Sequence, residues 1–236
     1  HAFASGTTLN GTYTQSTGNT AFNNTTLNTT YNLQGGTLSL TNGTTTLNGT
    51  LNYAGGAISG PGSATLALSA GDVLNVTGGT KEFSGAVLQN GGTVNLNLAA
   101  GNNLQISNGA SFTNTGTVNF NDNNSITLRS GFGPGTFNNA GGTLVVAAGK
   151  TGSVTLENAS FSGNGTLDTS AAGSQLALAP ISSASYSGTL NALGTDVTND
   201  SSTAHYALDQ IGATYNVSGA VDEDHRQLRL LDRKSV

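Results

Sequence analysis

The chain of 236 residues contains no cysteine, methionine or tryptophan and only three prolines. Charged residues make up 8% of it, against about 25% in an ordinary globular domain. Without cysteine a disulfide scaffold is excluded, and no apolar run is long enough to cross a bilayer as a helix. Only seven residues are Lys or Arg. Because binding to nucleic acid or to an anionic membrane needs a basic patch, neither partner is expected.

Gly, Thr, Asn, Ser and Ala fill the chain instead, and they follow a repeat. The recurring element is Gly-Thr followed by an apolar residue. From Val94 onward this apolar residue returns after 24, 26, 23 and 23 residues. The copies of the element begin at Gly36, Gly49, Gly92, Gly116, Gly142, Gly165 and Gly188. Such a period is typical of a repeat protein, in which each unit buries its apolar face only by stacking on its neighbours.

A second recurring element is a pair of apolar residues separated by one polar residue, as in Leu104/Ile106 and Val154/Leu156. This alternation is the period of a β-strand, and Gly, Asn or Ser bounds each short strand. The sequence therefore predicts an all-β parallel β-helix with coils of about 23 residues. An antiparallel sandwich is the main alternative, but the strands are too short for it.

The chain divides into two parts by charge. Residues 1–196 are predicted to form the β-helix, with 1–34 as a less regular N-terminal segment. Residues 197–236 hold ten of the nineteen charged residues and are interpreted as a C-terminal cap, or as the start of a following module. Repeat proteins need such a polar end to close their core. Within this segment, Asp222–Asp224 would form either a hairpin turn or the start of a short helix.

Asparagines recur at the turns of the repeat. Asn90, Asn114, Asn139 and Asn164 occupy similar places in successive blocks. Two interpretations remain open for them: a ladder of side-chain amides running from coil to coil, or generic turn residues.

The acids of residues 1–196 are few, and they fall at different phases of the repeat. They are Asp72, Glu82, Asp122, Glu157, Asp168 and Asp196. A carboxylate pair for glycoside hydrolysis must lie about 5–9.5 Å apart, which this scatter does not favour. The oxygen-rich stretches 121–124 and 222–225 are interpreted as solvated turns. The sequence thus predicts no catalytic residue, no cofactor site, no metal site and no enzyme activity.

Two further residue types would suit surface binding. A flat ice-binding array needs Thr-x-Thr on one face of successive coils, whereas the recurring Thr follows Gly only once per coil. The tyrosines would stack on sugars if exposed, but they are predicted to fill corners of the solenoid.

The Gly-Gly-Thr-Leu/Val turns, the alternating Leu, Val and Ile strands and the Asn/Thr/Ser surface of residues 35–193 resemble the passenger domains of bacterial secreted adhesins. These are the β-helices of autotransporters and of filamentous-haemagglutinin-like exoproteins. The resemblance implies a right-handed coil, a secreted or bacterial cell-surface location, and a role in adhesion, self-association, biofilm or filament formation. The implied partners are other copies of the chain, surface glycans or a host receptor. A carbohydrate-active β-helix enzyme and a non-catalytic carbohydrate-binding module are the alternative functions.

Overall fold

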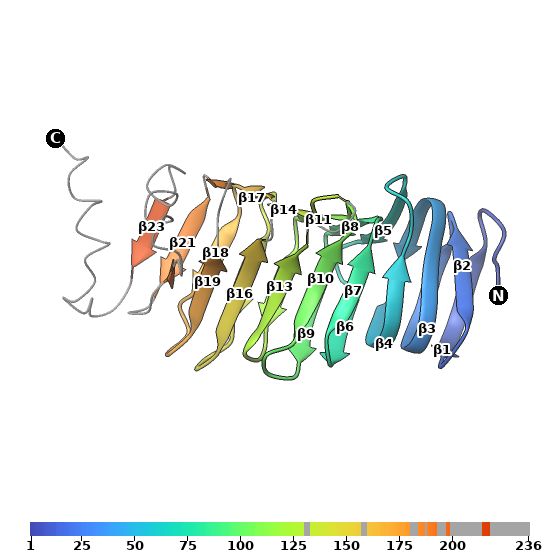
Figure 1. The fold of residues 1–236 in the computed structure, drawn as a ribbon, viewed down its shortest axis with the longest axis horizontal. Coiled ribbons are helices and arrows are strands. Elements are labelled where there is room, and N and C mark those ends of the chain that lie inside the picture. The colour runs from blue at the N-terminus through green and yellow to red at the C-terminus, as the bar shows by residue number, and fades with distance from the viewer. Residues whose placement is uncertain are drawn as a thin grey trace.

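The computed structural model of the chain describes residues 1–129, 133–156, 160–179, 184–186, 188–192, 197–198 and 214–217. These residues form an all-β solenoid of roughly 22-residue coils stacked along one long axis (Figure 1). Its β-sheet is wound into three faces, here called A, B and C, which the chain visits in turn. No helix occurs in the described part of the chain.

The strands of each face follow one another by pairing. Face A contains β1 (Thr8–Gln15), β3 (Thr26–Leu47), β4 (Thr50–Ser59), β6 (Val73–Gly78), β9 (Thr93–Leu98), β12 (Thr117–Phe120), β15 (Thr143–Val146), β18 (Thr166–Thr169), β21 (Thr189–Ala192) and β23 (Thr214–Val217). Face B contains β2 (Asn19–Asn23), parts of β3 and β4, β7 (Lys81–Ser84), β10 (Asn103–Ser107), β13 (Asn124–Leu128), β16 (Thr151–Leu156), β19 (Gln175–Ala179) and β22 (Val197–Thr198). Face C contains the last part of β3, β5 (Ala64–Leu68), β8 (Val87–Asn90), β11 (Ser111–Asn114), β14 (Thr136–Asn139), β17 (Ser160–Gly163) and β20 (Ala184–Tyr186).

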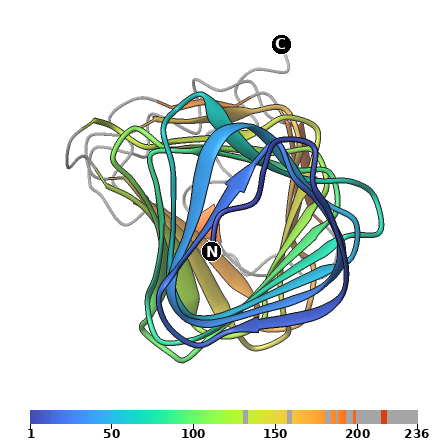
Figure 2. The same ribbon diagram turned by 90° about the vertical axis from the view of Figure 1, so that its right-hand side faces the viewer.

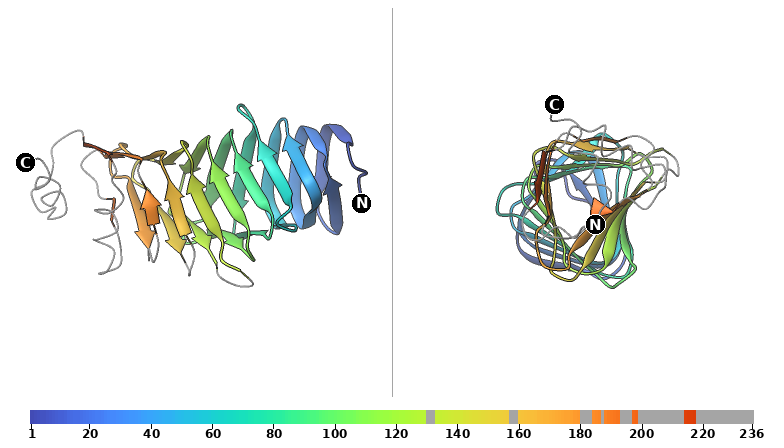
Figure 3. Two further views of the ribbon diagram at one scale, coloured as in Figure 1. Left: turned by 90° about the horizontal axis from the view of Figure 1, so that it is seen from above. Right: turned by 90° about the vertical axis from the view of Figure 1, so that its left-hand side faces the viewer.

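Every pairing between these strands is parallel, and equivalent residues of the repeat lie opposite one another. Val118 of β12, for example, lies opposite Val94 of β9 and Leu144 of β15. Figure 3, seen from above, shows the strands of successive coils side by side. The predicted parallel β-helix is thus confirmed, and the antiparallel sandwich is not the fold.

The interior is filled by one apolar residue from every second strand position. Leu, Val, Ile and Phe stack in columns because the register keeps like residues above one another. On face C the rings of Phe112 and Phe137 are stacked with centroids 4.7 Å apart, and Phe161 follows edge-on at 5.4 Å. Aromatic pairs in these arrangements stabilise a core beyond the area they bury.

From Gly49 onward the glycine of the Gly-Thr element lies at the corner that leads into face A, whereas Gly36 precedes the face B part of β3. The threonine after it donates its N–H to the carbonyl oxygen one coil earlier, as in Thr117 to Gly92 (2.9 Å) and Thr166 to Gly142 (2.8 Å). A β carbon on Gly116 or on Gly165 would overlap that same oxygen. The repeated glycine is therefore required by the close approach of consecutive coils.

Residues 1–34, expected to be less regular, pair in parallel like the later coils, but the register shifts between Phe22 and Asn23 and again after Leu33. All eight residues of β1 pair with β3 without a shift, from Thr8 opposite Thr26 to Gln15 opposite Leu33. The separation is 18 residues here, against 28 between Asn124 and Gly152. Shorter corners shorten the coil, so the period changes in the sequence while the backbone stacking does not. Figure 2 shows the N-terminus over the centre of this end, where the Phe3 and Phe22 ring centroids are 5.5 Å apart.

The parallel pairing also reaches beyond the predicted boundary at residue 196. Strand β22 continues face B, and Thr214 of β23 pairs with Thr189 of β21 on face A. The rest of the expected C-terminal cap, including the Asp222–Asp224 acids, lies outside the described residues.

Candidate functional site: the polar outer face

Face A carries the most regular outer surface of the solenoid. Each of its strands contributes four consecutive positions, and in most coils these read Thr, apolar, Asn, apolar, as in Thr93-Val94-Asn95-Leu96. The two apolar residues point inward and are fully buried. The Thr and Asn side chains point outward and are half-buried. Because a strand alternates its side chains, one Thr row and one Asn row run side by side along the rod.

The Asn row is joined by hydrogen bonds from coil to coil. We call it the outer ladder, and it consists of Asn32, Asn52, Asn75, Asn95 and Asn119. Each Nδ2 donates to the Oδ1 one coil earlier, at 2.8 Å from Asn52, 2.9 Å from Asn75, 2.9 Å from Asn95 and 2.8 Å from Asn119. Asn32 donates in turn to the hydroxyl of Thr14 at 3.4 Å. The outer ladder ends where Val145 lies opposite Asn119.

The outer ladder uses only part of each amide. An Asn side chain has two N–H donors and an oxygen with two lone pairs, and each rung from Asn52 to Asn95 uses one of each. The remaining N–H and lone pair have no partner within the described residues. The rotamers of these side chains are fixed by their neighbours, so less conformational entropy is lost when they bind a ligand.

A second ladder lies inside the solenoid, where the sequence suggested one. Asn90 donates to Asn114, and Asn114 donates to Asn139, both at 2.7 Å. These three buried residues form the inner ladder. Asn164 does not belong to it: Gly163 lies opposite Asn139, and Asn164 is exposed one position further on. The amide ladder is thus confirmed for three residues, and the assignment of Asn164 to it is wrong.

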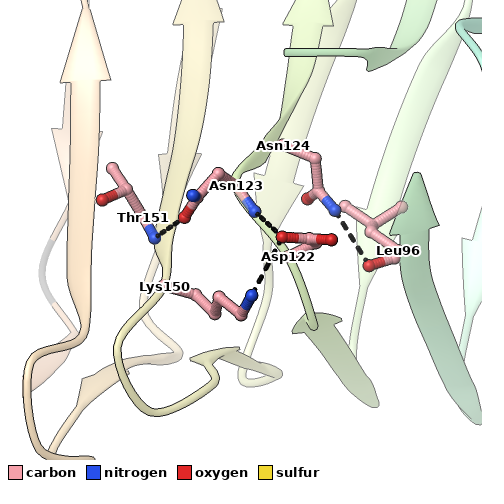
Figure 4. Close-up of polar contacts among 6 residues, drawn as sticks. All are labelled: Leu96, Asp122, Asn123, Asn124, Lys150 and Thr151. Atoms are coloured by element: carbon pink, nitrogen blue, oxygen red, sulfur yellow. Dashed lines mark hydrogen bonds and ion pairs between the residues drawn. The ribbon is translucent and has the colours of Figure 1, made fainter. Parts of the chain in front are cut away.

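The oxygen-rich stretch 121–124 is a turn held by its own chain (Figure 4). Oδ1 of Asp122 accepts the N–H of Asn123 at 2.8 Å and lies 3.1 Å from Nζ of Lys150 in the next coil. Asn123 Oδ1 accepts the N–H of Thr151, and Asn124 donates to the Leu96 carbonyl. Asn124 Oδ1 is buried with no hydrogen-bond partner in the described chain. Lys150 thus occupies the position of a counter-ion beside the Asp122 carboxylate.

The Asp122 carboxyl should titrate below the usual range. The Asn123 N–H, followed by the hydrogen bond and charge of Lys150, lowers its pKa. Because the folded pKa is lowered, any stability that this group contributes is present above its unfolded pKa of about 3.9 and is lost as the pH falls through the folded value. We expect Lys150→Met to raise the pKa of Asp122 partway toward that value in an NMR titration. Lys150→Arg should preserve the lowered pKa, and equal values in all three proteins would contradict the assignment.

The other acids are used singly. The buried Asp72 carboxylate accepts the N–H groups of Gly49 (2.8 Å) and Ser69 (2.7 Å), which ties two coils together. Glu82 accepts the hydroxyl of Ser107 at 2.6 Å, and Asp168 accepts the N–H of Ser170 at 2.9 Å. Glu157 and Asp196 lie outside the described residues. No group of three His, Cys, Asp or Glu side chains that would hold a metal ion occurs in the part of the chain that the structure describes.

Lys81 is a buried lysine, which the sequence analysis did not single out. It takes an inward position on β7, is 5% exposed, and donates to the Gly79 carbonyl at 2.8 Å. Its Nζ lies 5.9 Å from the ring centroid of Tyr53. Burial lowers the pKa of the Lys81 amine and raises that of the Tyr53 phenol to about 12. Lys81 lies opposite Leu104 of β10. The only signal of its burial in the sequence is the alternation Lys-Glu-Phe-Ser, which puts the side chains of Lys81 and Phe83 on the same side of the strand.

The tyrosines whose side chains are described lie in the face A strands β1, β3 and β4. Tyr31 and Tyr53 are buried, and Tyr13 stacks on Tyr31 with ring centroids 6.4 Å apart. A row of exposed tyrosines for stacking on sugars is not formed by these three residues.

Neither a membrane-spanning helix in the described residues nor a similarity to a known protein indicates a function for this chain. No helix of the described chain is long and apolar enough to cross a membrane. Comparison of the sequence and the fold with protein-family models, with curated proteins and with solved structures finds no match, so the polar face is assessed by its own geometry.

Proposed function

We propose that the chain is a non-catalytic structural and adhesive β-solenoid, secreted or held at a bacterial cell surface. The observation that carries this proposal is the outer ladder and its neighbouring Thr row, an ordered and uncharged hydrogen-bonding surface on a stiff rod. The resemblance of residues 35–193 to secreted adhesin passengers supports the same function. Adhesion to surface glycans or to a host receptor, self-association, and biofilm or filament formation are the activities proposed for it.

The low charge supports this function physically. Net charge keeps proteins apart in solution, and this chain carries a formal net charge of only −5 over 236 residues. Repulsion therefore does little to prevent close contact with another surface. Hydrogen bonds from a pre-ordered surface then supply specificity at a low entropic cost.

The proposal is tested with beads coated with the purified chain. We expect coated beads to cluster with one another or to attach to bacterial or host cells, and to do so more than beads coated with serum albumin. A chain unfolded before coating is the matched control, because it keeps the composition and loses the ordered face. Coated beads that behave like the albumin beads would contradict the proposal. Release of soluble sugar from a polysaccharide by the chain would instead support the carbohydrate-active alternative.

A further inference from the structure

Face A differs from the other faces in its outward amide ladder, and its first charged side chain is Asp168 of β18. From β1 to β15 its outward positions carry only Thr, Asn and Val side chains. Face B carries Glu82 in β7, and face C presents Thr, Ser, Gln, Asn, Ala and Val outward, while its amide ladder in the described strands is the buried inner ladder. A ligand that recognises order rather than charge would therefore select face A.

The spacing of face A is set by the stacking of coils. Most coils add one Thr hydroxyl and one Asn amide to the rows, at the separation of about 4.8 Å between paired strands, while Val73 interrupts the Thr row and Val145 ends the Asn row. Both rows run parallel to the long axis of the rod, because the strands are nearly perpendicular to it (Figure 1). A linear polymer lying along this axis can therefore contact several rungs at once.

The chemistry of the rungs indicates what that polymer offers. The rungs from Asn52 to Asn95 each have one spare N–H donor and one spare acceptor lone pair, as argued above, and each Thr hydroxyl both donates and accepts. Sugar hydroxyls also donate and accept, so they match both rows. Sulfate or carboxylate groups would find no cation on this face, and the burial of an unpaired charge is unfavourable.

We propose that face A binds an extended, uncharged polysaccharide laid along the rod. This inference rests on the proposed adhesive function and names its partner. Coil-by-coil contacts make the interaction multivalent, so that weak single contacts add up along the polymer. Because no charge takes part, binding is insensitive to salt.

The test uses substitutions that the chain itself tolerates. Val73 already occupies the Thr row, so Thr50→Val, Thr93→Val, Thr117→Val and Thr143→Val together remove hydroxyls while preserving branched strand residues. The matched control places four Thr→Val substitutions on face C, at Thr46, Thr65, Thr113 and Thr136, which also point outward from their strands. Circular dichroism and melting of both variants establish that each is folded.

Binding is measured to cellulose and chitin by co-sedimentation and to amylose by affinity electrophoresis, with heparin as the charged comparison. We expect the native chain and the face C variant to bind at least one neutral polymer equally, at low and at high salt. The face A variant should bind about tenfold more weakly or worse. Equal binding by all three proteins, no binding to any neutral polymer, or binding to heparin alone would overturn the proposal. So would a concentration-dependent dimer of the native chain that the face A variant loses, since face A would then bind a second copy.

These outcomes separate the inference from the function on which it rests. Beads coated with the face A variant that still cluster or attach to cells leave the adhesive function in place and refute its assignment to face A. Native beads that do neither refute the adhesive function itself, whatever the polysaccharides show.

Discussion

Gly116→Ala is expected to destabilise the solenoid by about 4 kcal/mol or more, a loss reserved for strain or overpacking that cannot relax. The new β carbon would overlap the carbonyl oxygen of Gly92 in the preceding coil. That oxygen accepts the N–H of Thr117 at 2.9 Å, while the Gly116 carbonyl accepts the N–H of Thr143 at 2.8 Å. Since the backbone is tied to coils on both sides, it has no direction in which to withdraw.

The measurement is thermal and urea unfolding followed by circular dichroism. For a chain of this length such a loss corresponds to a fall in Tm on the order of 10 °C. Gly62→Ala is the matched control: a β carbon there would meet only the Gly85 oxygen, at an ordinary 3.7 Å. That variant should unfold within about 0.5 kcal/mol of the native chain. Equal Tm values for the two variants would contradict the conclusion that the stacking of coils requires glycine at this corner.

The same corner explains why the fold was readable from the sequence. One position in most coils accepts only glycine, and a Thr and an apolar residue follow it. This recurring triplet reveals the period of the repeat in the sequence. In the first coils the separation between paired residues is 18 to 21 residues. A search for a period near 23 therefore loses them, although Leu27 and Leu33 are as buried as any later core residue.

The two ladders show what a sequence alone leaves undetermined. The Asn row of face A corresponds in the sequence to an Asn two positions after the recurring Thr. A ladder was considered only for the asparagines at turns, because Asn is common in turns. On face C the blocks differ by one residue at the corner, so Asn164 looks equivalent to Asn139 by its neighbours while Gly163 takes the register position. A one-residue shift turns a side chain to the opposite side of a strand. The strand pairing of the folded chain, and not the sequence pattern, shows where such a shift occurs.

The hydrogen-bond partners of buried polar groups are a second feature that the sequence does not predict. Lys81 occupies an inward position because its ammonium reaches the Gly79 carbonyl at 2.8 Å, a partner that no strand pattern reveals. Tyr53 is similar, since its buried hydroxyl lies 2.7 Å from the Glu82 carbonyl oxygen. Alternation identifies which side of the sheet a residue faces, while the fate of its polar atoms depends on the corner nearby.

Asn114→Leu should cost about 3 kcal/mol, because it removes the middle rung of the inner ladder. Asn114 is fully buried, accepts from Asn90 and donates to Asn139, each at 2.7 Å. A hydrogen bond contributes about 1 kcal/mol net, and a buried polar group left without its partner costs about 1–3 kcal/mol more. Leu has a similar volume, so the loss reports the amide rather than a cavity.

Asn164→Leu is the control, since Asn164 lies at the corresponding end of a face C strand, directly after β17, but is exposed. Its effect on the free energy of unfolding should stay within about 0.5 kcal/mol. Asn119→Leu adds a comparison on the outside, where the amide is half-buried and water replaces the Asn95 contact of 2.8 Å, so a loss between the two is expected. If Asn164→Leu cost as much as Asn114→Leu, the register that places Gly163 opposite Asn139 would be refuted. If neither substitution mattered, amide ladders would only decorate a rod held together by its apolar interior and its corner glycines.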